Sequence, residues 1–469
     1  MHVHETTAAA PAPEGGVLVT DLSPRGVGIG RLADGRVCFA PGALPGDTVR
    51  VQERHRGQRS TTVQVLELQE PSPDRRDAPC ALAGRCGGCQ LQALTDGAQR
   101  SWKQRHVRET LRRIGGISIP LPMLVSDERS LGYRNKAVIP LARGGKGLVM
   151  GFYAPDSHRV VPLQHCPVLD PRLDALLPGL LADINGSSWP VYNEASGKGA
   201  LRHLALRVGA NSGEVLLTIV SRDRQLTDIH ALARHWMAEI PGLVGVCLNV
   251  QPERSNRVFG RQTLCIEGRD WLIEHFAGLR LQIGPDTFFQ ANTSVAEMLL
   301  PHLRAAFAGT EQHLLIDAYC GIGTLTLPLA ASAPLLLGIE RHRGSIREAR
   351  NSARINGLSH VRFEAEDVSA ALPARLGDCT GLLLDPPRKG LDADLCRAIG
   401  EQAPQRLAYL SCSPASLARD LRLLLEPGHY QLDGVICFDF FPQTGHVETL
   451  AVLSRAGGPR AVLPVPRAA

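Results

Sequence analysis

The stretch Leu407–Leu417 reads LAYLSCSPASL, and its pattern is the one on which the C-terminal part of the chain is built. Four apolar residues are followed by the polar run SCSP and then by a helical pattern over 415–425. This order predicts a buried strand, a loop and a helix. Ligands bind beyond the carboxyl ends of strands in open α/β sheets, so Cys412 is a candidate nucleophile. The helix N-terminus after it is expected to favour the thiolate. The alternative is packing, because cysteines often behave as small buried hydrophobes.

The same alternation of strands and helices runs through residues 313–454. Short apolar runs predict parallel strands, amphipathic segments predict the helices between them, and two last runs predict an antiparallel pair. The expected strands are 313–318, 335–340, 361–365, 381–385, 407–411, 435–440 and 446–453, and the expected helices are 324–331, 344–355, 393–402 and 415–425. This alternation predicts a doubly wound, Rossmann-like sheet.

A glycine loop, DAYCGIGT, follows the first of these strands. Gly321 and Gly323 let the backbone approach a ligand where the strand order reverses. Glu340, ending the second strand, suits the hydroxyls of a ribose, and Asp367, after the third, suits an adenine amino group. Asp385 ends the fourth strand, beside the same ligand. The loop is not GxGxxG and has no lysine for phosphate, which favours S-adenosylmethionine over a dinucleotide or ATP. Each acid has the alternative of a helix cap or a surface charge.

The length and composition of the chain limit the classes of protein to which it can belong. A chain of 469 residues is expected to form two to four domains. No apolar run approaches the ~20 residues that span a bilayer, and no secretory leader is recognisable. We therefore expect a cytoplasmic protein, in which the twelve cysteines are thiols or metal ligands rather than disulfides. The net charge of +5 is compatible with a nucleic-acid partner.

The N-terminal part predicts a small barrel. Residues 1–11 are Ala, Pro and Thr rich and are expected to be disordered. Residues 12–72 hold short β-branched runs separated by Gly, Pro and Asp, as in an OB-like antiparallel barrel. Within them, DLSPRGVGIGRLADGRVCFAPGALPGDTVRV (21–51) resembles the TRAM domain, an RNA-binding module of RNA-modifying enzymes. Its arginines are predicted either to meet RNA phosphates or to form a solvated face.

Three cysteines follow within ten residues, Cys80, Cys86 and Cys89 in CALAGRCGGC. Thiols at this density favour a metal centre over three coincidental core residues. The fourth ligand must come from elsewhere, and Cys166 is the best candidate because Pro167 follows it. His165 is the alternative. Four thiolates suit a [4Fe-4S] cluster or structural zinc, and the spacing does not separate the two.

Residues 98–114 predict an amphipathic helix with a basic face, which is either solvated or lines a nucleic-acid groove. The face comprises Arg100, Lys103, Arg105, Arg108, Arg112 and Arg113, and the packed stripe comprises Trp102, Val107, Leu111 and Ile114. Between 132 and 284 the chain predicts antiparallel strands with a few helices. At the start of the first of these strands, Arg134, Asn135 and Lys136 are possible RNA contacts. Residues 455–469 are expected to be disordered.

Several motifs together resemble one family. They are DTFFQAN (286–292), DAYCGIGTLTLPLA (317–330), LLLDPPRKGL (382–391), YLSCSPASLARDL (409–421) and HVETLAVL (446–453), with the three-cysteine run before them. This combination resembles the bacterial RNA 5-methyluridine methyltransferases, specifically the branch that acts on 23S ribosomal RNA and carries a TRAM domain and an iron-sulfur cluster. The resemblance covers the chain from about residue 16 to residue 453.

The resemblance implies a multidomain α/β architecture. Residues 12–72 would be the TRAM barrel, 73–91 with 125–284 a central mixed α+β domain holding the cysteine cluster, and 92–124 with 285–454 the S-adenosylmethionine-dependent methyltransferase domain. The family's substrate would be a flipped-out uridine of 23S ribosomal RNA, bound by a protein expected to be monomeric. A transfer-RNA uracil-5 methyltransferase and a non-catalytic RNA-binding scaffold are the alternatives.

The resemblance also implies roles for single residues. Cys412 would be the nucleophile and Glu448 the base, with His446 as the alternative base. The residues implied to contact the methyl donor are Gln290, Tyr319, Glu340 and Asp385, with Gly321, Gly323, Thr324 and Asp367 close by. The residues implied to hold the [4Fe-4S] cluster are Cys80, Cys86, Cys89 and Cys166.

Overall fold

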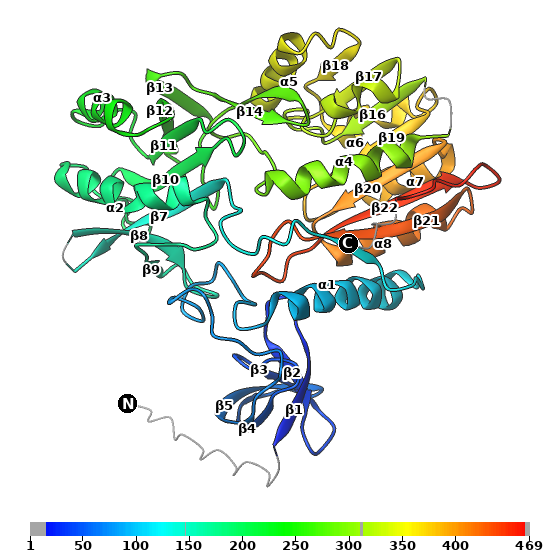
Figure 1. The fold of residues 1–469 in the computed structure, drawn as a ribbon, viewed down its shortest axis with the longest axis horizontal. Helices are drawn as coiled ribbons and strands as arrows, with labels where there is room; N and C mark the ends of the chain where they lie inside the picture. Colours follow the sequence, from blue (N-terminus) through cyan, green and yellow to red (C-terminus); the bar gives the residue numbers. More distant parts are fainter. Residues whose placement is uncertain (1–15, 146, 310–312, 465–469) are drawn as a thin grey trace. The chain divides into compact units, whose positions relative to one another are not determined.

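The computed structural model describes residues 16–145, 147–309 and 313–464, which form two compact units (Figure 1). The first unit comprises the described residues up to Trp102 together with 153–159 and 441–446. The second comprises 103–152, 160–440 and the described residues from 447 onward. The disorder expected for 1–11 lies outside the described residues. No helix of the described residues is both long and apolar enough to cross a membrane.

A closed five-stranded barrel forms the core of the first unit, as predicted, but it is not wholly antiparallel because its strands β3 and β5 run parallel. Its strand order is β1-β2-β3-β5-β4. The strands are β1 (Val17–Leu22), β2 (Gly28–Arg31), β3 (Val37–Ala40), β4 (Thr48–Arg56) and β5 (Ser60–Glu70). Alternate residues point inward, so Val17 and Val19 of β1 pack with Val49 and Val63 in a small apolar core. The cysteine run after β5 is folded as turns.

The loop 441–446 returns to the first unit and is held there by backbone and amide hydrogen bonds. The carbonyl of Gln443 accepts from the amides of Gln90 (3.0 Å) and Leu91 (2.9 Å). Its own amide donates to Oε1 of Gln99 at 2.9 Å. Gln99 belongs to helix α1 (Asp96–Thr110), which runs on into a π-helical turn, η1 (Leu111–Gly115).

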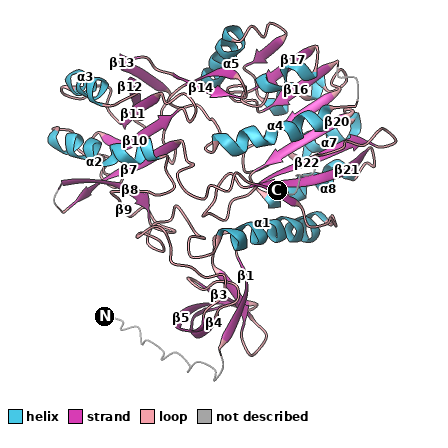
Figure 2. Cartoon of the chain, viewed as in Figure 1, coloured by secondary structure: helices cyan, strands magenta, loops and turns pink. Residues whose placement is uncertain are grey.

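The second unit contains a seven-stranded sheet of order β13-β12-β11-β10-β7-β8-β9 (Figure 2). Of its paired strands with a recorded register, only β11 and β12 run parallel, so the predicted antiparallel character holds apart from that pair. Its elements are β7 (Lys136–Gly144), β8 (Gly147–Tyr153), β9 (Val160–Pro162), α2 (Pro171–Gly186), β10 (Leu201–Val208), β11 (Val215–Ser221), α3 (Ile229–Glu239), β12 (Leu243–Val250) and β13 (Gln262–Gly268). A hairpin of β14 (Leu272–Phe276) and β15 (Leu279–Ile283) follows.

The predicted doubly wound sheet is the second sheet of this unit, with the order β18-β17-β16-β19-β20-β22-β21-β6. Five strands are parallel, β22 is antiparallel to β20, and the order reverses between β16 and β19. The elements are β6 (Met123–Val125), α4 (Thr293–Phe307), β16 (Leu314–Ala318), η2 (Leu327–Ser332), β17 (Leu335–Ile339), α5 (Arg343–Ile355), β18 (Val361–Glu364), α6 (Val368–Ala371), η3 (Pro373–Arg375), β19 (Gly381–Leu384), α7 (Ala393–Gln402), β20 (Arg406–Ser411), α8 (Pro414–Leu425), β21 (Tyr430–Phe438) and β22 (Glu448–Arg455).

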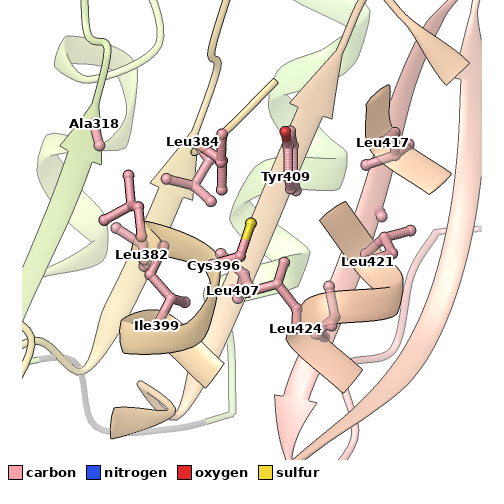
Figure 3. Close-up of a cluster of buried hydrophobic side chains, with 14 of the residues drawn as sticks. Ala318, Leu382, Leu384, Cys396, Ile399, Leu407, Tyr409, Leu417, Leu421 and Leu424 are labelled. Carbon is pink, nitrogen blue, oxygen red and sulfur yellow. The ribbon is translucent and has the colours of Figure 1, made fainter. Parts of the chain in front are cut away.

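Helices α7 and α8 cover one face of this sheet with a close-packed apolar core (Figure 3). Leu382 and Leu407 of the sheet lie against Ile399 of α7 and Leu421 of α8, all of them fully buried. The one polar atom that Tyr409 brings into this core is satisfied, because its hydroxyl donates to Oδ2 of Asp420 at 2.6 Å. The core fixes where β19 and β20 end, and therefore where the residues after them lie.

Three expectations differ from the structure. The helix expected at 324–331 is a short 3₁₀ helix, η2, because residues 321–326 form turns before it begins. In the basic helix, Lys103 is not outward but fully buried, with its Nζ 2.6 Å from Oδ1 of Asp439. Ile114, expected to pack, is 44% exposed.

The C-terminal segment also differs from the expectation of disorder over 455–469. Arg455 is still part of β22, and Arg460 pairs with the buried carboxylate of Asp433 at 3.0 Å. The amide of Ala461 donates to the same carboxylate at 2.9 Å. Residues 465–469 lie outside the described residues.

Candidate active site

The carboxyl ends of the parallel strands bring the glycine loop and two acids to one edge of the sheet. Ala318, the last residue of β16, pairs with Ile339 of β17 on one side and with Leu384 of β19 on the other. Glu340 and Asp385 are the next residues of those two strands, and the amide of Asp385 donates to the carbonyl of Ala318 at 3.3 Å. This edge is where the strand order reverses, which is the usual ligand site of the architecture.

Cys412 directly follows strand β20 and Glu448 begins strand β22, and these two antiparallel strands are neighbours in the sheet (Figure 1). The register pairs Ser411 of β20 with Thr449 of β22, so one step outward sets Cys412 opposite Glu448. Cys412 is partly buried, whereas Glu448 is only 7% exposed. Ser413, immediately after the cysteine, caps helix α8 by accepting from the amide of Ser416. A strand end and a helix start therefore hold Cys412 from both sides.

Burial and neighbouring charges set the protonation of this pair. Burial, and then the charge of Glu448, raise the pKa of Cys412 to about 11, and Arg388 opposes them. Burial, and then Asp385, raise the pKa of Glu448 to about 8, again against Arg388. The helix N-terminus was expected to favour the thiolate, and the net shift of the Cys412 pKa runs the other way because burial is its largest cause. A thiol beside a carboxyl that titrates near neutrality is suited to proton exchange.

Two further residues at this edge of the sheet were not predicted from the sequence to belong to the site. Arg388 is the positive charge that opposes the raised pKa values of both Cys412 and Glu448. Asp317 is 1% exposed, and its Oδ1 has no hydrogen-bond partner among the described residues. Burial raises the pKa of Asp317 to about 8 and that of Asp385 to about 7. The sequence did hold a signal for Asp317, which is an acid inside the otherwise apolar strand LLIDA. Burying an acid costs free energy, so its presence there indicates a function.

The loop after β16 has the backbone conformation that its glycines predict. Gly321 and Gly323 have φ values of +56° and +81°, and Tyr319 is also left-handed at +70°. A Cβ on Gly323 would meet Phe363 at 3.0 Å, so glycine is required there. A Cβ on Gly321 would meet nothing within 4 Å, which leaves open space beside the loop. Thr324 continues the loop and is buried.

The remaining acids of the predicted cofactor site have partial structural roles. Glu340 is half-buried, and its Oε1 accepts from the amide of His342 at 2.7 Å. Asp367 is exposed and caps α6, with Oδ1 accepting from the amide of Ser369 at 3.0 Å. The helix-cap alternative is therefore realised for Asp367. Burial raises the pKa of Tyr319 to about 12, and a hydrogen bond with Ser369 partly offsets that rise.

Gln290 lies in a loop that residues at the start of strand β7 hold in place. The carbonyl of Gln290 accepts from Nδ2 of Asn135 at 2.8 Å, and the carbonyl of Ala291 accepts from the Asn135 amide at 3.0 Å. The Nζ of Lys136 donates to the carbonyl of Thr287 at 3.3 Å. Asn135 is 1% exposed, so the structure assigns it to supporting this loop rather than to the surface contact that the sequence suggested.

The four cysteines expected to bind a cluster are divided between the units. Cys80, Cys86 and Cys89 belong to the first unit, and Cys166 belongs to the second. The thiols of Cys80 and Cys86 each accept a backbone amide at 3.4 Å, from Leu82 and Gly88. Burial raises the pKa of Cys86. Across the described ranges, no group of three or more His, Cys, Asp or Glu side chains is gathered as a metal site.

The two histidines named as alternatives, one as a metal ligand and one as the base, have other neighbours. His165, the alternative fourth ligand, is largely exposed, with its Nδ1 3.2 Å from Oδ2 of Asp174. The amide of Cys166 donates to the other oxygen of the same carboxylate at 2.6 Å. His446, the alternative base, belongs to the first unit and lies edge-on to Phe441, with ring centroids 6.1 Å apart.

Two family models match the sequence. The model described as tRNA (Uracil-5-)-methyltransferase matches residues 259–456, and the TRAM domain matches residues 16–52. The first match contains the glycine loop, Cys412 and Glu448, and the second covers most of the N-terminal barrel.

Whole-chain relatives agree with these matches. An uncharacterized RNA methyltransferase of Gloeobacter violaceus is 45% identical over 442 residues, which are 94% of this chain and 96% of the relative. Others, from Synechocystis sp. and Halalkalibacterium halodurans, are 42% and 34% identical, with 94% and 93% of this chain covered and 95% and 96% of theirs. Among solved structures, the tRNA (uracil-54, C5)-methyltransferase of Pyrococcus abyssi, in complex with S-adenosyl-L-homocysteine, has a TM-score of 0.71 at 24% identity and covers 93% of this chain and 100% of its own. That likeness shows a shared fold.

Alkylation of Cys412 by iodoacetamide is expected to speed up with pH, about tenfold per pH unit through the neutral range, because only the thiolate reacts. The Glu448→Gln variant should react faster than the wild type above about pH 8, where Glu448 is ionised and holds the pKa of Cys412 up. Arg388→Gln should react more slowly. The rates are measured by mass spectrometry of the peptide that contains Cys412. A rate that does not change with pH would contradict the raised thiol pKa.

Proposed function

We propose, from the premise that this chain belongs to the family of RNA uracil-5-methyltransferases that carry a TRAM domain, that it methylates carbon 5 of a specific uridine in 23S ribosomal RNA. S-adenosyl-L-methionine is the methyl donor of this proposal, and a covalent adduct of Cys412 at carbon 6 is its intermediate. The observation that carries the proposal is the register of β20 and β22, which sets the thiol of Cys412 opposite the buried carboxyl of Glu448 at the ligand edge of the sheet.

Carbon 5 of uracil is a weak nucleophile and must be activated before it can accept a methyl group. In the proposed reaction Cys412 loses its proton and its thiolate adds to carbon 6, which moves an electron pair into the ring as an enolate. Arg388 opposes the pKa-raising effects at Cys412 and so assists the loss of the proton. Carbon 5, now electron-rich, would form the new bond to the methyl group as the bond between that methyl group and the donor's sulfur breaks, with its electron pair left on sulfur.

Glu448 would complete the reaction. Its carboxylate removes the proton from carbon 5, the electron pair re-forms the ring double bond, and the bond between carbon 6 and sulfur breaks to release Cys412 as the thiolate. In its ionised form, a carboxyl whose pKa is raised to about 8 is a stronger base than an ordinary glutamate. The uridine has to leave any helical stack to reach these groups, since base pairing hides carbons 5 and 6.

The residues of the sheet edge fit S-adenosyl-L-methionine. Open space lies beside Gly321, and Asp317, whose Oδ1 has no hydrogen-bond partner among the described residues, belongs to the strand that leads into this loop. In the proposal, Gln290, Tyr319, Glu340 and Asp385 hold the methyl donor, with Gly321, Gly323, Thr324 and Asp367 close by. The bound donor supplies the methyl group. Asp385 or the amide of Gln290 reads the ring NH of uracil, which cytosine lacks.

The choice of RNA is the finer part of the proposal. The N-terminal barrel and the cysteine run favour ribosomal RNA, because both characterise that branch in the resemblance drawn above. Transfer RNA is the second candidate, favoured by the description of the matching family model and by the substrate named for the Pyrococcus abyssi structure. A scaffold without catalysis is disfavoured, because Cys412, Glu448 and the glycine loop are all retained.

We propose further that Cys80, Cys86, Cys89 and Cys166 hold a [4Fe-4S] cluster. Four thiols are the donor set that such a cluster takes, and backbone amides directed at Cys80 and Cys86 would stabilise thiolates on iron. Burial raises the pKa of Cys86, so a bound metal would be needed to keep its sulfur ionised.

Cys412→Ala is expected to abolish methylation while leaving the affinity for the methyl donor unchanged, because the thiol acts on the RNA. Glu448→Gln should instead slow turnover by about 10²–10⁴-fold and accumulate a covalent complex with RNA, because the carbon 5 proton stays in place. Methyl transfer from labelled donor and denaturing electrophoresis measure the two effects. Retained turnover in Cys412→Ala, or no excess adduct in Glu448→Gln, would refute the respective role.

In a strain that lacks the gene, one uridine of 23S ribosomal RNA should lose its carbon 5 methyl group while transfer RNA keeps its own. Mass-spectrometric mapping of both RNAs measures this, with the wild-type gene restored as the control. Loss of the methyl group from transfer RNA alone would establish the second candidate in place of the first.

Anaerobically purified protein should be brown, with broad absorption near roughly 400 nm from thiolate-bound iron and sulfide. Cys86→Ser should lose that absorption. Cys265→Ser, at an exposed cysteine outside the run, should keep it. Colourless protein that contains stoichiometric zinc would replace the cluster with a structural zinc site.

A further inference from the structure

A hollow of about 420 Å³ lies on the doubly wound sheet's open edge, away from Cys412. It is bounded by helix α5 and by the residue after the edge strand β18, and its lining residues are Arg343, Ile346, Arg347, Arg350, Asn351 and Ala365. Three of the six are arginines of one helix, at spacings of four and three residues, which places them along one face. The proposed reaction uses none of them.

These arginines are poorly neutralised by the protein. Arg343 has no carboxylate partner among the described residues, and the carboxylate paired with Arg347 is Asp270, with Oδ2 as far as 3.9 Å from the guanidinium. Arg350 donates from Nη2 to the carbonyl of Phe363 at 2.6 Å rather than to an acid. On the barrel, by contrast, Arg36 and Arg50 pair with Glu53 and Glu67 at 2.8 Å and 3.0 Å.

The N-terminus of helix α5 adds to the positive potential of the hollow. Arg343 is its first residue, and the first turn, RGSI, has no acidic residue, although a helix N-terminus favours negative charge. The one acid of the helix, Glu348, is 1% exposed and so does not face the hollow's solvent. Another face of α5 packs on β15, where Oγ of Ser352 accepts from the amide of Gln282 at 2.9 Å. The arginine face therefore stays open to a partner.

We propose that this hollow binds backbone phosphates of the RNA substrate; the inference rests on the proposed function. Arg343 and Arg350 are seven residues apart, or about 10 Å along the helix, which is longer than one phosphate needs and matches about three nucleotides of a stacked strand. The apolar members, Ile346 and Ala365, offer no donors to base edges. Contacts from the arginines to phosphates would position the RNA without reading its sequence.

The location suits a strand that also delivers its uridine to Cys412. The sheet order from the edge to the cysteine is β18-β17-β16-β19-β20, four spacings or about 19 Å. A stacked strand covers that distance in about six nucleotides. Phosphates held at α5 would fix the far end of the same strand and lower the cost of presenting the flipped uridine.

The test is a double variant of the full chain, Arg343→Gln with Arg347→Gln. Arg350 is left in place, because it holds the carbonyl of Phe363 in the edge strand. The matched control is Arg354→Gln in the last turn of α5, outside the hollow. Binding of a fluorescein-labelled single-stranded oligouridylate is measured by anisotropy over a range of salt, and methylation kinetics are measured on the RNA that the wild type modifies.

The double variant should lower the slope of log K against log salt by roughly 1.4, or about 0.7 for each lost phosphate contact. Its KM for RNA should rise while kcat and the affinity for S-adenosyl-L-methionine stay at wild-type values. Arg354→Gln should behave as the wild type. An unchanged slope in the double variant, or an equal decrease of the slope in the control, would refute RNA binding by the hollow. The methyltransferase proposal would be unaffected. A wild-type protein that neither binds nor methylates RNA would refute both proposals.

Discussion

The pairing of β20 with β22 is the constraint on which the rest of the site depends. Leu410 pairs with Leu450 and Ser411 with Thr449, so the next residues outward are the thiol and the carboxyl. Side chains alternate across a strand, and a slip of one residue would turn Glu448 to the other face. The register is fixed because β20 is fully buried and β22 nearly so, with α7 and α8 packed on the sheet.

That packed edge gathers carboxyl groups at an energetic cost. Asp317 and Glu448 are buried there and Asp385 is partly buried, and desolvation raises the pKa of each to between about 7 and about 8. Near neutral pH these groups are poised between the two forms. A ligand with a positive charge would favour their ionised forms, which is the change that a sulfonium compound brings. The same burial raises the pKa of Cys412 to about 11 although Arg388 opposes it, so the thiol form predominates near neutral pH.

Strong local patterns allowed most of the fold to be predicted from the sequence. The apolar runs gave the order of strands β16 to β20, and the β-branched runs gave the barrel, because both depend on periodicity alone. The prediction was wrong for residues whose burial depends on partners far away in the sequence. Lys103 is buried by Asp439, more than three hundred residues away, and Asn135 is buried by the loop around Gln290. The direction of the Cys412 pKa shift likewise depends on burial by distant segments, which no local motif expresses. The iron-sulfur site at the cysteine run remains a prediction. Its four expected ligands belong to two different units of the structure.

The measurement that tests the central claim most directly uses RNA in which the target uridine carries fluorine at carbon 5. Fluorine cannot leave as a cation, so Glu448 would have nothing to remove, and the reaction would stop after methyl transfer with sulfur still bound to carbon 6. Peptide mass spectrometry should then find Cys412 linked to a methylated, fluorinated nucleotide, formed only when S-adenosyl-L-methionine is present. Free Cys412 after complete incubation, or a link to any other cysteine, would contradict the account.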